Sequence, residues 1–139
     1  MTSNVSHAAS SLKRSGPTLL IVEDESIARR ALAILLGASG YVANAVESAE
    51  KALETVEDVG VPTLALVDVD LPGMSGLELV AELERIRPDL MTVLVSATDG
   101  ERIRSFCREH EQVTYIRKPL DFPKLLSLID EKVQGGEYH

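Results

Sequence analysis

The sequence predicts an α/β fold in which five strands alternate with five helices around a parallel sheet. Short, continuous apolar runs are typical of strands buried on both faces. The segments between these runs carry apolar residues at helical intervals. The length of 139 residues, with 45% hydrophobic and 26% charged residues, suits one domain around a single core. Regular alternation of strand and helix favours a parallel sheet with helices on both faces and right-handed crossovers.

Three apolar runs predict the clearest strands, at residues 18–22, 64–67 and 91–95. Residues 41–45 and 113–117 are weaker candidates, because polar residues interrupt them. Each run is bounded by turn residues or by the start of a helical pattern, which gives strands of ordinary length. The chain therefore offers five strands in a regular succession.

Five apolar stripes predict the helices that separate and follow these strands. Their members are Ile27, Ala31, Leu35 and Ala38; Ala49, Ala52, Leu53 and Val56; Leu79, Leu83 and Ile86; Ile103, Phe106, Cys107 and His110; and Phe122, Leu125, Leu126, Ile129 and Val133. Ser75 and Glu78 have the spacing of a capping box, and Asp99 and Asp121 stand where N-caps are expected. Cys107 lies on one of the stripes, so we expect it in the core rather than at a reactive site.

Five such units fit a doubly wound, flavodoxin-like (βα)5 fold with strand order 2-1-3-4-5. We expect the domain to span residues 17–133, with a flexible N-terminal tail at 1–16 and a C-terminal tail at 134–139. In this order the topological switch point lies between strands 1 and 3. Ligands of such sheets bind there, at the carboxyl ends of the strands.

The composition excludes several classes of function. With 14 Lys and Arg against 22 Asp and Glu, the net charge of −8 opposes direct nucleic-acid binding. The single cysteine excludes a disulfide scaffold and a cysteine-rich zinc site. The sequence contains neither a run of about 20 apolar residues nor a signal-peptide pattern, so we expect a cytoplasmic protein without a membrane segment.

Four acidic residues follow two strands that are neighbours in the predicted order. Glu23 and Asp24 follow the first strand, and Asp68 and Asp70 lie at the end of the third. Two carboxylates about 4 Å apart repel by roughly 4 kcal/mol at an effective dielectric constant of about 20. Such a cluster must protonate, move apart or bind a cation. Oxygen ligands without His or Cys favour Mg²⁺.

Two further strand ends offer groups that suit a phosphoryl ligand. The fourth strand is followed by Ser96 and Thr98, which provide hydroxyl groups, and the fifth by Lys118, which provides an ammonium group. A divalent cation, a hydroxyl donor and a lysine around one carboxylate would neutralise the oxygens of a transferring phosphoryl group.

These residues resemble the receiver domains of two-component response regulators. The resemblance is carried by residues 20–25 (LIVEDE), 66–76 (LVDVDLPGMSG), 93–97 (VLVSA) and 115–119 (YIRKP), and it covers roughly residues 18–133. It departs from the usual pattern at Glu23, where Asp is commoner, and at 109–112 (EHEQ), where a Gly-Ala pair is common.

The resemblance implies a role for each site residue. Asp68 would accept a phosphoryl group, and Lys118 and Ser96 would contact its oxygens. The residues implied to hold Mg²⁺ are Glu23, Asp24, Asp68 and, through its main-chain carbonyl, Asp70. Ser96 and Tyr115 would form a conformational switch, and Asp70 and Thr98 would modulate rates, with the sign of the Asp70 effect left open. A cis peptide bond between Lys118 and Pro119 is also implied.

The resemblance further implies a signalling phosphoacceptor rather than an enzyme. The phosphodonor would be a histidine kinase or a histidine phosphotransfer protein. A downstream protein would bind the face formed by the fourth helix, the fifth strand and the fifth helix. We expect a stand-alone receiver, the alternative being the front of a longer regulator with an output domain. Two other hypotheses remain at this stage: a phosphatase of the haloacid dehalogenase type, suggested by Asp68-Val69-Asp70, and a receiver-like interaction domain that is never phosphorylated.

Overall fold

The computed structural model describes residues 16–137 and confirms the predicted α/β fold. The predicted tail at 1–16 lies outside the described residues except for its last position. The elements are β1 (Thr18–Val22), α2 (Ser26–Ala38), β2 (Val42–Val46), α3 (Ala49–Val59), β3 (Leu64–Asp68), α4 (Gly76–Ile86), β4 (Met91–Ser96), α5 (Glu101–Glu109), β5 (Val113–Arg117) and α6 (Phe122–Glu137). All strand pairs are parallel, and the sheet order is β2-β1-β3-β4-β5, as predicted.

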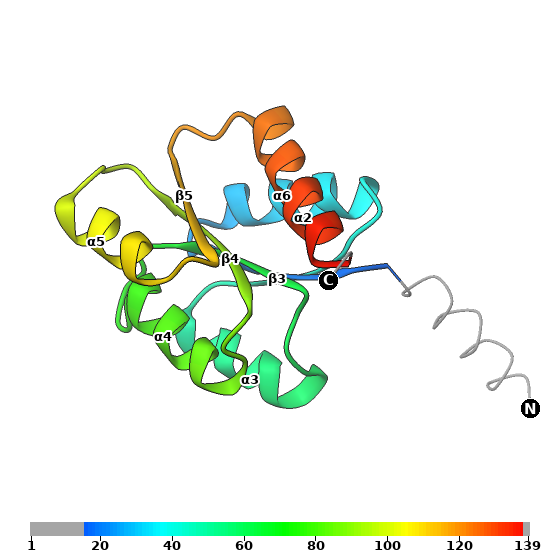
Figure 1. Ribbon diagram of the computed structural model, residues 1–139. Helices are drawn as coiled ribbons and strands as arrows, with labels where there is room; N and C mark the ends of the chain where they lie inside the picture. Colours follow the sequence, from blue (N-terminus) through cyan, green and yellow to red (C-terminus); the bar gives the residue numbers. More distant parts are fainter. Residues whose placement is uncertain (1–15, 138–139) are drawn as a thin grey trace, which may run out of the picture.

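The sheet separates two hydrophobic layers (Figure 1). Helices α2 and α6 cover one face, and α3, α4 and α5 cover the other. Every residue of β3 is buried, because this central strand is covered on both sides. The alternation within β1 sends Leu20 and Val22 to the layer under α3 to α5, and Leu19 and Ile21 to the layer under α2 and α6. This two-sided burial explains the continuous apolar runs in the sequence.

The buried face of α2 is not the one that the sequence pattern predicted. All four residues of the predicted stripe, from Ile27 to Ala38, are exposed, and Ile27 is 76% exposed. The helix instead buries Leu32 and Leu36, one position further along. Because α2 carries apolar residues on two adjacent faces, its periodicity could not decide which of them meets the sheet.

The helix termini include one wrong prediction. Ser75 and Glu78 form the predicted capping box, and Asp121 accepts a hydrogen bond from the main-chain N–H of Lys124 at 3.1 Å. Asp99, however, is not an N-cap. Helix α5 begins after Gly100 without a side-chain cap, because the Asp99 carboxylate instead pairs with Arg104 at 3.1 Å.

The last helix runs further than predicted. Helix α6 continues to Glu137, so the predicted C-terminal tail at 134–139 is helical over 134–137, and 138–139 lie outside the described residues. Leu125, Ile129 and Val133 form its buried stripe, and a turn of helix beyond Val133 does not need an apolar residue to continue. Over residues 16–137, no helix is both long and apolar enough to cross a bilayer.

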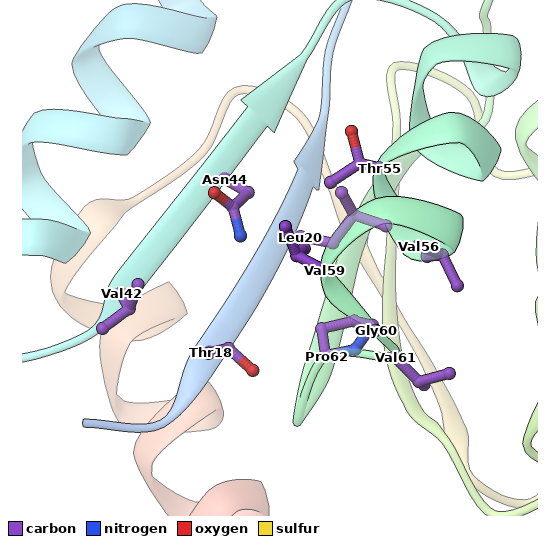
Figure 2. A pocket seen from close by; sticks show the side chains of 10 residues that line it. All are labelled: Thr18, Leu20, Val42, Asn44, Thr55, Val56, Val59, Gly60, Val61 and Pro62. Carbon is purple, nitrogen blue, oxygen red and sulfur yellow. The ribbon is translucent and has the colours of Figure 1, made fainter. Parts of the chain in front are cut away.

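A cavity of about 220 Å³ lies between α3 and the strands β1 and β2 (Figure 2). Its walls are mainly apolar, but Asn44 contributes an amide from the middle of β2. Asn44 is opposite Leu20 in the strand register and therefore faces α3. The cavity also includes Thr18, at the start of β1, so it extends away from the carboxyl ends of the strands.

The loop between α5 and β5 is attached to the end of α4, and this accounts for the unusual 109–112 segment. The Glu84 carboxylate accepts a hydrogen bond from Gln112 and pairs with Nδ1 of His110 at 2.7 Å. Gln112 also donates to the carbonyl of Pro88 at 3.0 Å, and the His110 ring stacks on Phe106 with 4.0 Å between centroids. Polar contacts and stacking therefore hold this loop.

Cys107, in α5, is half-buried and packs against the core, in line with the prediction.

Candidate functional site

Four strands deliver the predicted site residues to one edge of the sheet. Glu23 and Asp24 directly follow β1, Asp68 ends β3, Ser96 ends β4, and Lys118 directly follows β5. The hydrogen-bond ladder continues to this edge, since the N–H of Lys118 donates to the carbonyl of Ser96 at 2.8 Å. The N–H of Glu23 likewise donates to the carbonyl of Val46 at 3.0 Å. The sheet register therefore sets the spacing of the site.

Three acidic side chains meet at this edge. Glu23, Asp24 and Asp68 each place a carboxylate oxygen within 4.8 Å of the other two. Glu23 and Asp68 are each only 4% exposed, whereas Asp24 is open to solvent. Burial raises the pKa of the Glu23 carboxyl above its usual value; the N–H of Glu25 opposes this rise, and the charge of Asp68 adds to it. This set of hard oxygen donors fits a divalent cation such as Mg²⁺.

Lys118 lies against the two buried acids. Its Nζ is 2.9 Å from Oδ2 of Asp68 and 3.4 Å from Oε1 of Glu23. Burial by itself lowers the pKa of the Lys118 ammonium, but the hydrogen bond and charge of Asp68, with those of Glu23, outweigh it and raise the pKa. The lysine is therefore charged at neutral pH and offsets part of the acidic cluster.

Backbone groups orient the acidic side chains. The N–H of Asp70 donates to Oδ1 of Asp68 at 2.8 Å, and the N–H of Glu25 donates to Oε2 of Glu23 at 3.1 Å. Each buried carboxylate thus has one oxygen held by the main chain and the other facing Lys118. Two strong donors on different oxygens fix the rotation of Asp68.

Two residues that support the acidic loop were missed by the sequence analysis. Glu25 caps α2 by accepting hydrogen bonds from the N–H groups of Ile27 and Ala28 at 3.3 and 2.9 Å. Arg29 donates from Nη1 to the carbonyls of Glu23 and Asp24 at 3.0 and 3.2 Å. The position of Arg29, one helical turn after the cap, is the only signal in the sequence that could have suggested this contact.

Asp70 does not join the cation cluster with its side chain. The three carboxylates that lie within 4.8 Å of one another do not include that of Asp70, whose predicted role was through its main-chain carbonyl. Oδ2 of Asp70 accepts a hydrogen bond from the hydroxyl of Ser96 at 3.1 Å instead. Ser96 is fully buried at the end of β4, so this hydrogen bond joins the exposed Asp70 to a buried hydroxyl.

A chain of hydrogen bonds continues from Ser96 to Tyr115. Oγ of Ser96 accepts from the N–H of Thr98 at 3.1 Å and lies 3.2 Å from the Thr98 hydroxyl. The hydroxyl of Tyr115 donates to the carbonyl of Thr98 at 2.7 Å. The structure thus connects Ser96 and Tyr115, the two predicted switch residues, through the segment that follows β4. The peptide bond between Lys118 and Pro119 is cis, as the resemblance implied.

Comparison with known proteins identifies the family. Residues 19–130 match the family described as the response regulator receiver domain. The chain belongs to this family. The match covers all five strands and most of α6, so the receiver domain accounts for nearly the whole described structure.

Curated relatives of this receiver domain are longer proteins. It is 38% identical over 122 residues to a cyclic di-GMP phosphodiesterase of Thermotoga maritima, covering 88% of this chain and 32% of the relative. It is 35% identical over 109 residues to the two-component response regulator PhoP of Pseudomonas aeruginosa, covering 77% of this chain and 47% of PhoP. The chain thus spans about a third to a half of the length of these relatives.

Solved structures show the same fold. A CheY-like response regulator receiver domain of Methanospirillum hungatei JF-1 superposes with a TM-score of 0.83 at 28% identity, covering 89% of this chain and 98% of the other. The response regulator TrrA of Thermotoga maritima, in complex with Mg²⁺ and BeF, gives a TM-score of 0.73 at 27% identity, covering 84% and 98% of the two chains. This receiver domain is therefore a signalling domain with a flavodoxin-like architecture.

Proposed function

We propose that this receiver domain accepts a phosphoryl group on Asp68 from a phosphohistidine of a histidine kinase or a histidine phosphotransfer protein. The observation that carries the proposal is the contact between the buried Asp68 carboxylate and Lys118, made directly beside Glu23 and Asp24. A carboxylate held between backbone N–H and ammonium groups is oriented for nucleophilic attack. The neighbouring acids suit a cation that offsets the incoming charge.

The transfer exchanges one bond for another. A carboxylate oxygen of Asp68 forms the new P–O bond while the P–N bond of the phosphohistidine breaks, and the electron pair of that bond returns to the imidazole. The phosphoryl group then carries a charge of about −1.5 to −2 into a site where the Lys118 ammonium contacts Asp68. Lys118 stabilises the phosphoryl oxygens electrostatically, and its hydrogen-bond partners Asp68 and Glu23 hold it in place.

The residues that would hold Mg²⁺ are Glu23, Asp24, Asp68 and, through its main-chain carbonyl, Asp70. The three carboxylates supply oxygen ligands at one edge of the sheet, and the exposed Asp24 keeps that edge open to solvent and to a phosphodonor. When bound, the cation neutralises negative charge on the transferring phosphoryl group. Glu23 is longer than the commoner Asp and can reach a cation through a water molecule.

Two surfaces suit the partners of such a reaction. Helix α2 starts beside the acidic cluster with the exposed Ile27, and Ile34 and Leu35 are exposed about two turns further along the helix; we assign this apolar surface to a phosphodonor protein. The face formed by α5, β5 and α6 exposes Arg102 and Arg117 on an otherwise acidic protein, and we assign it to the downstream protein. We propose that the phosphoryl state controls these protein contacts and that the domain turns over no other substrate. We also propose that the protein is cytoplasmic and that this chain does not bind nucleic acid.

The decisive experiment is phosphoryl incorporation with and without Mg²⁺, using acetyl phosphate and a panel of histidine kinases as donors. We expect stoichiometric, Mg²⁺-dependent labelling that Asp68→Asn abolishes. Asp89→Asn removes an exposed carboxylate whose one ion pair within residues 16–137 is with Arg87; it serves as a charge-matched control and should label normally. Labelling that survives Asp68→Asn, or a complete lack of labelling with both kinds of donor, would refute the proposal. Turnover of a small phosphomonoester would indicate a phosphatase instead.

A further inference from the structure

We propose that the Asp70 carboxylate holds the Ser96 hydroxyl away from the phosphoryl group and thereby opposes phosphorylation of Asp68. This inference rests on the proposed function, and it gives the direction in which the Asp70 carboxylate changes the phosphorylation of Asp68. In the structure, Oγ of Ser96 donates to Oδ2 of Asp70 at 3.1 Å. Asp70 acts here as a positioning residue, through Ser96.

The hydrogen-bond capacity of Ser96 makes the contact exclusive. A serine hydroxyl has one hydrogen to donate. The carboxylate is the strongest acceptor within reach, so that hydrogen points to Asp70. The Thr98 N–H, which only donates, takes a lone pair of Oγ at 3.1 Å, and the Thr98 hydroxyl at 3.2 Å can take the other. The hydrogen bond from Ser96 to Asp70 must therefore break before the Ser96 hydroxyl can donate to a phosphoryl oxygen.

The charge of Asp70 acts in the same direction. Its backbone N–H already donates to Oδ1 of Asp68 at 2.8 Å, so the two residues are locked close together by the turn after β3. A phosphoryl group on Asp68 would bring a further charge of about −1.5 to −2 next to the Asp70 carboxylate. Lys118 contacts Asp68 and Glu23 and makes no contact with Asp70, so the Asp70 charge has no cation partner among the described ion pairs.

The contact also reaches Tyr115. Thr98 binds Ser96 with its N–H and accepts the Tyr115 hydroxyl with its carbonyl at 2.7 Å. Asp70, Ser96, Thr98 and Tyr115 are thus four successive members of one hydrogen-bonded chain. Breaking the hydrogen bond between Ser96 and Asp70 would free the segment that binds the Tyr115 hydroxyl. The Asp70 carboxylate therefore stabilises the arrangement of all four residues seen in the structure.

The test measures the affinity for beryllofluoride, a phosphoryl mimic, in saturating Mg²⁺, from the amide NMR signals of Ser96, Thr98 and Tyr115. We expect Asp70→Ala to bind it about tenfold more tightly, which is the scale of one partly exposed hydrogen bond to a charged group. Asp70→Asn keeps an acceptor for Ser96 but loses the charge, so we expect a smaller gain. Asp99→Asn removes a charge from the same loop region without touching Ser96 and should change the affinity less than twofold.

Two further measurements separate this mechanism from a structural effect. In a Ser96→Ala background the Asp70→Ala gain should shrink to the part caused by charge alone. Mg²⁺ affinity without beryllofluoride should not rise in Asp70→Ala, since a nearby negative charge has been lost. Equal or weaker beryllofluoride binding by Asp70→Ala, or an undiminished gain in the Ser96→Ala background, would overturn the inference. A wild-type protein that binds no beryllofluoride and takes no label would overturn the proposed function instead.

Discussion

The ammonium of Lys118 lies 2.9 Å from the carboxylate of Asp68 and only 3.4 Å from that of Glu23. One cation is therefore shared by two acids that are almost completely buried. In the proposed reaction, the Lys118 ammonium neutralises part of the negative charge that would otherwise attract a divalent cation, and it would contact the phosphoryl group once that group is on Asp68. These two roles have opposite consequences when the lysine is removed.

Replacing Lys118 with alanine should strengthen Mg²⁺ binding and weaken phosphorylation. We expect about tenfold tighter Mg²⁺ binding, because a competing positive charge is lost from the cluster. Labelling by acetyl phosphate should slow by about a hundredfold, the usual cost of losing one group that stabilises the transferring oxygens. Calorimetric titration and labelling kinetics measure the two effects. Lys124→Ala, on the exposed side of α6, should change neither, and an unaltered Mg²⁺ affinity in Lys118→Ala would contradict the prediction.

The exposed apolar face of α2 should matter only for protein phosphodonors. In a variant with both Ile27→Ser and Ile34→Ser, we expect transfer from a kinase to slow by about tenfold, since two apolar contacts of roughly 0.7 kcal/mol each are lost. Labelling by acetyl phosphate should be unchanged, because this small donor does not need the surface. The matched control is Ile86→Ser, which removes a 55% exposed isoleucine from the far end of α4. Equal slowing with both donors would argue against a docking role.

Gly76 allows α4 to start directly against the site. A Cβ at this position would lie 2.2 Å from the main-chain oxygen of Asp68 and 2.8 Å from Cα of Val69. Gly76→Ala should therefore lower the free energy of unfolding by about 2 kcal/mol and reduce labelling of Asp68, because backbone must move. Gly37→Ala, in the last turns of α2, meets nothing within 4 Å and should raise stability by about 0.5–1 kcal/mol. Urea denaturation of both variants provides the comparison.

Asn44 should limit stability without contributing to the site. Its amide faces the cavity of about 220 Å³ between α3 and the strands, in register with the buried Leu20 (Figure 2). We expect Asn44→Val to raise the free energy of unfolding by about 1 kcal/mol, since a β-branched apolar side chain suits a strand and fills part of the cavity. Labelling of Asp68 should not change. Asn44→Asp, which adds a charge at the same place, should destabilise the domain, and a gain in stability there would contradict the explanation.

The sheet and most of the site could be predicted from the sequence, because both depend on where buried strands end. Asp68 follows the apolar run at 64–67 and Lys118 follows the weaker strand candidate at 113–117, and the order of these strands determines the edge at which the two residues meet. The buried face of α2 could not be predicted in the same way, since Leu32 and Leu35 are equally apolar and only the packed sheet selects between them. The partner of Asp70 was also beyond the sequence pattern, which places Asp70 near both Asp24 and Ser96 without deciding between them.

A ladder of main-chain hydrogen bonds joins β1, β3, β4 and β5, the four strands at whose ends the site lies. The groups proposed to react are spaced by backbone pairing in the interior, whereas the surfaces proposed for partners are formed largely by side chains on the outside of helices. A set of exposed residues from another regulator could therefore be transplanted onto α2 or α5 without disturbing the distances between Asp68, Lys118 and Ser96. The molecule would then carry the same phosphoryl chemistry into a different signalling circuit.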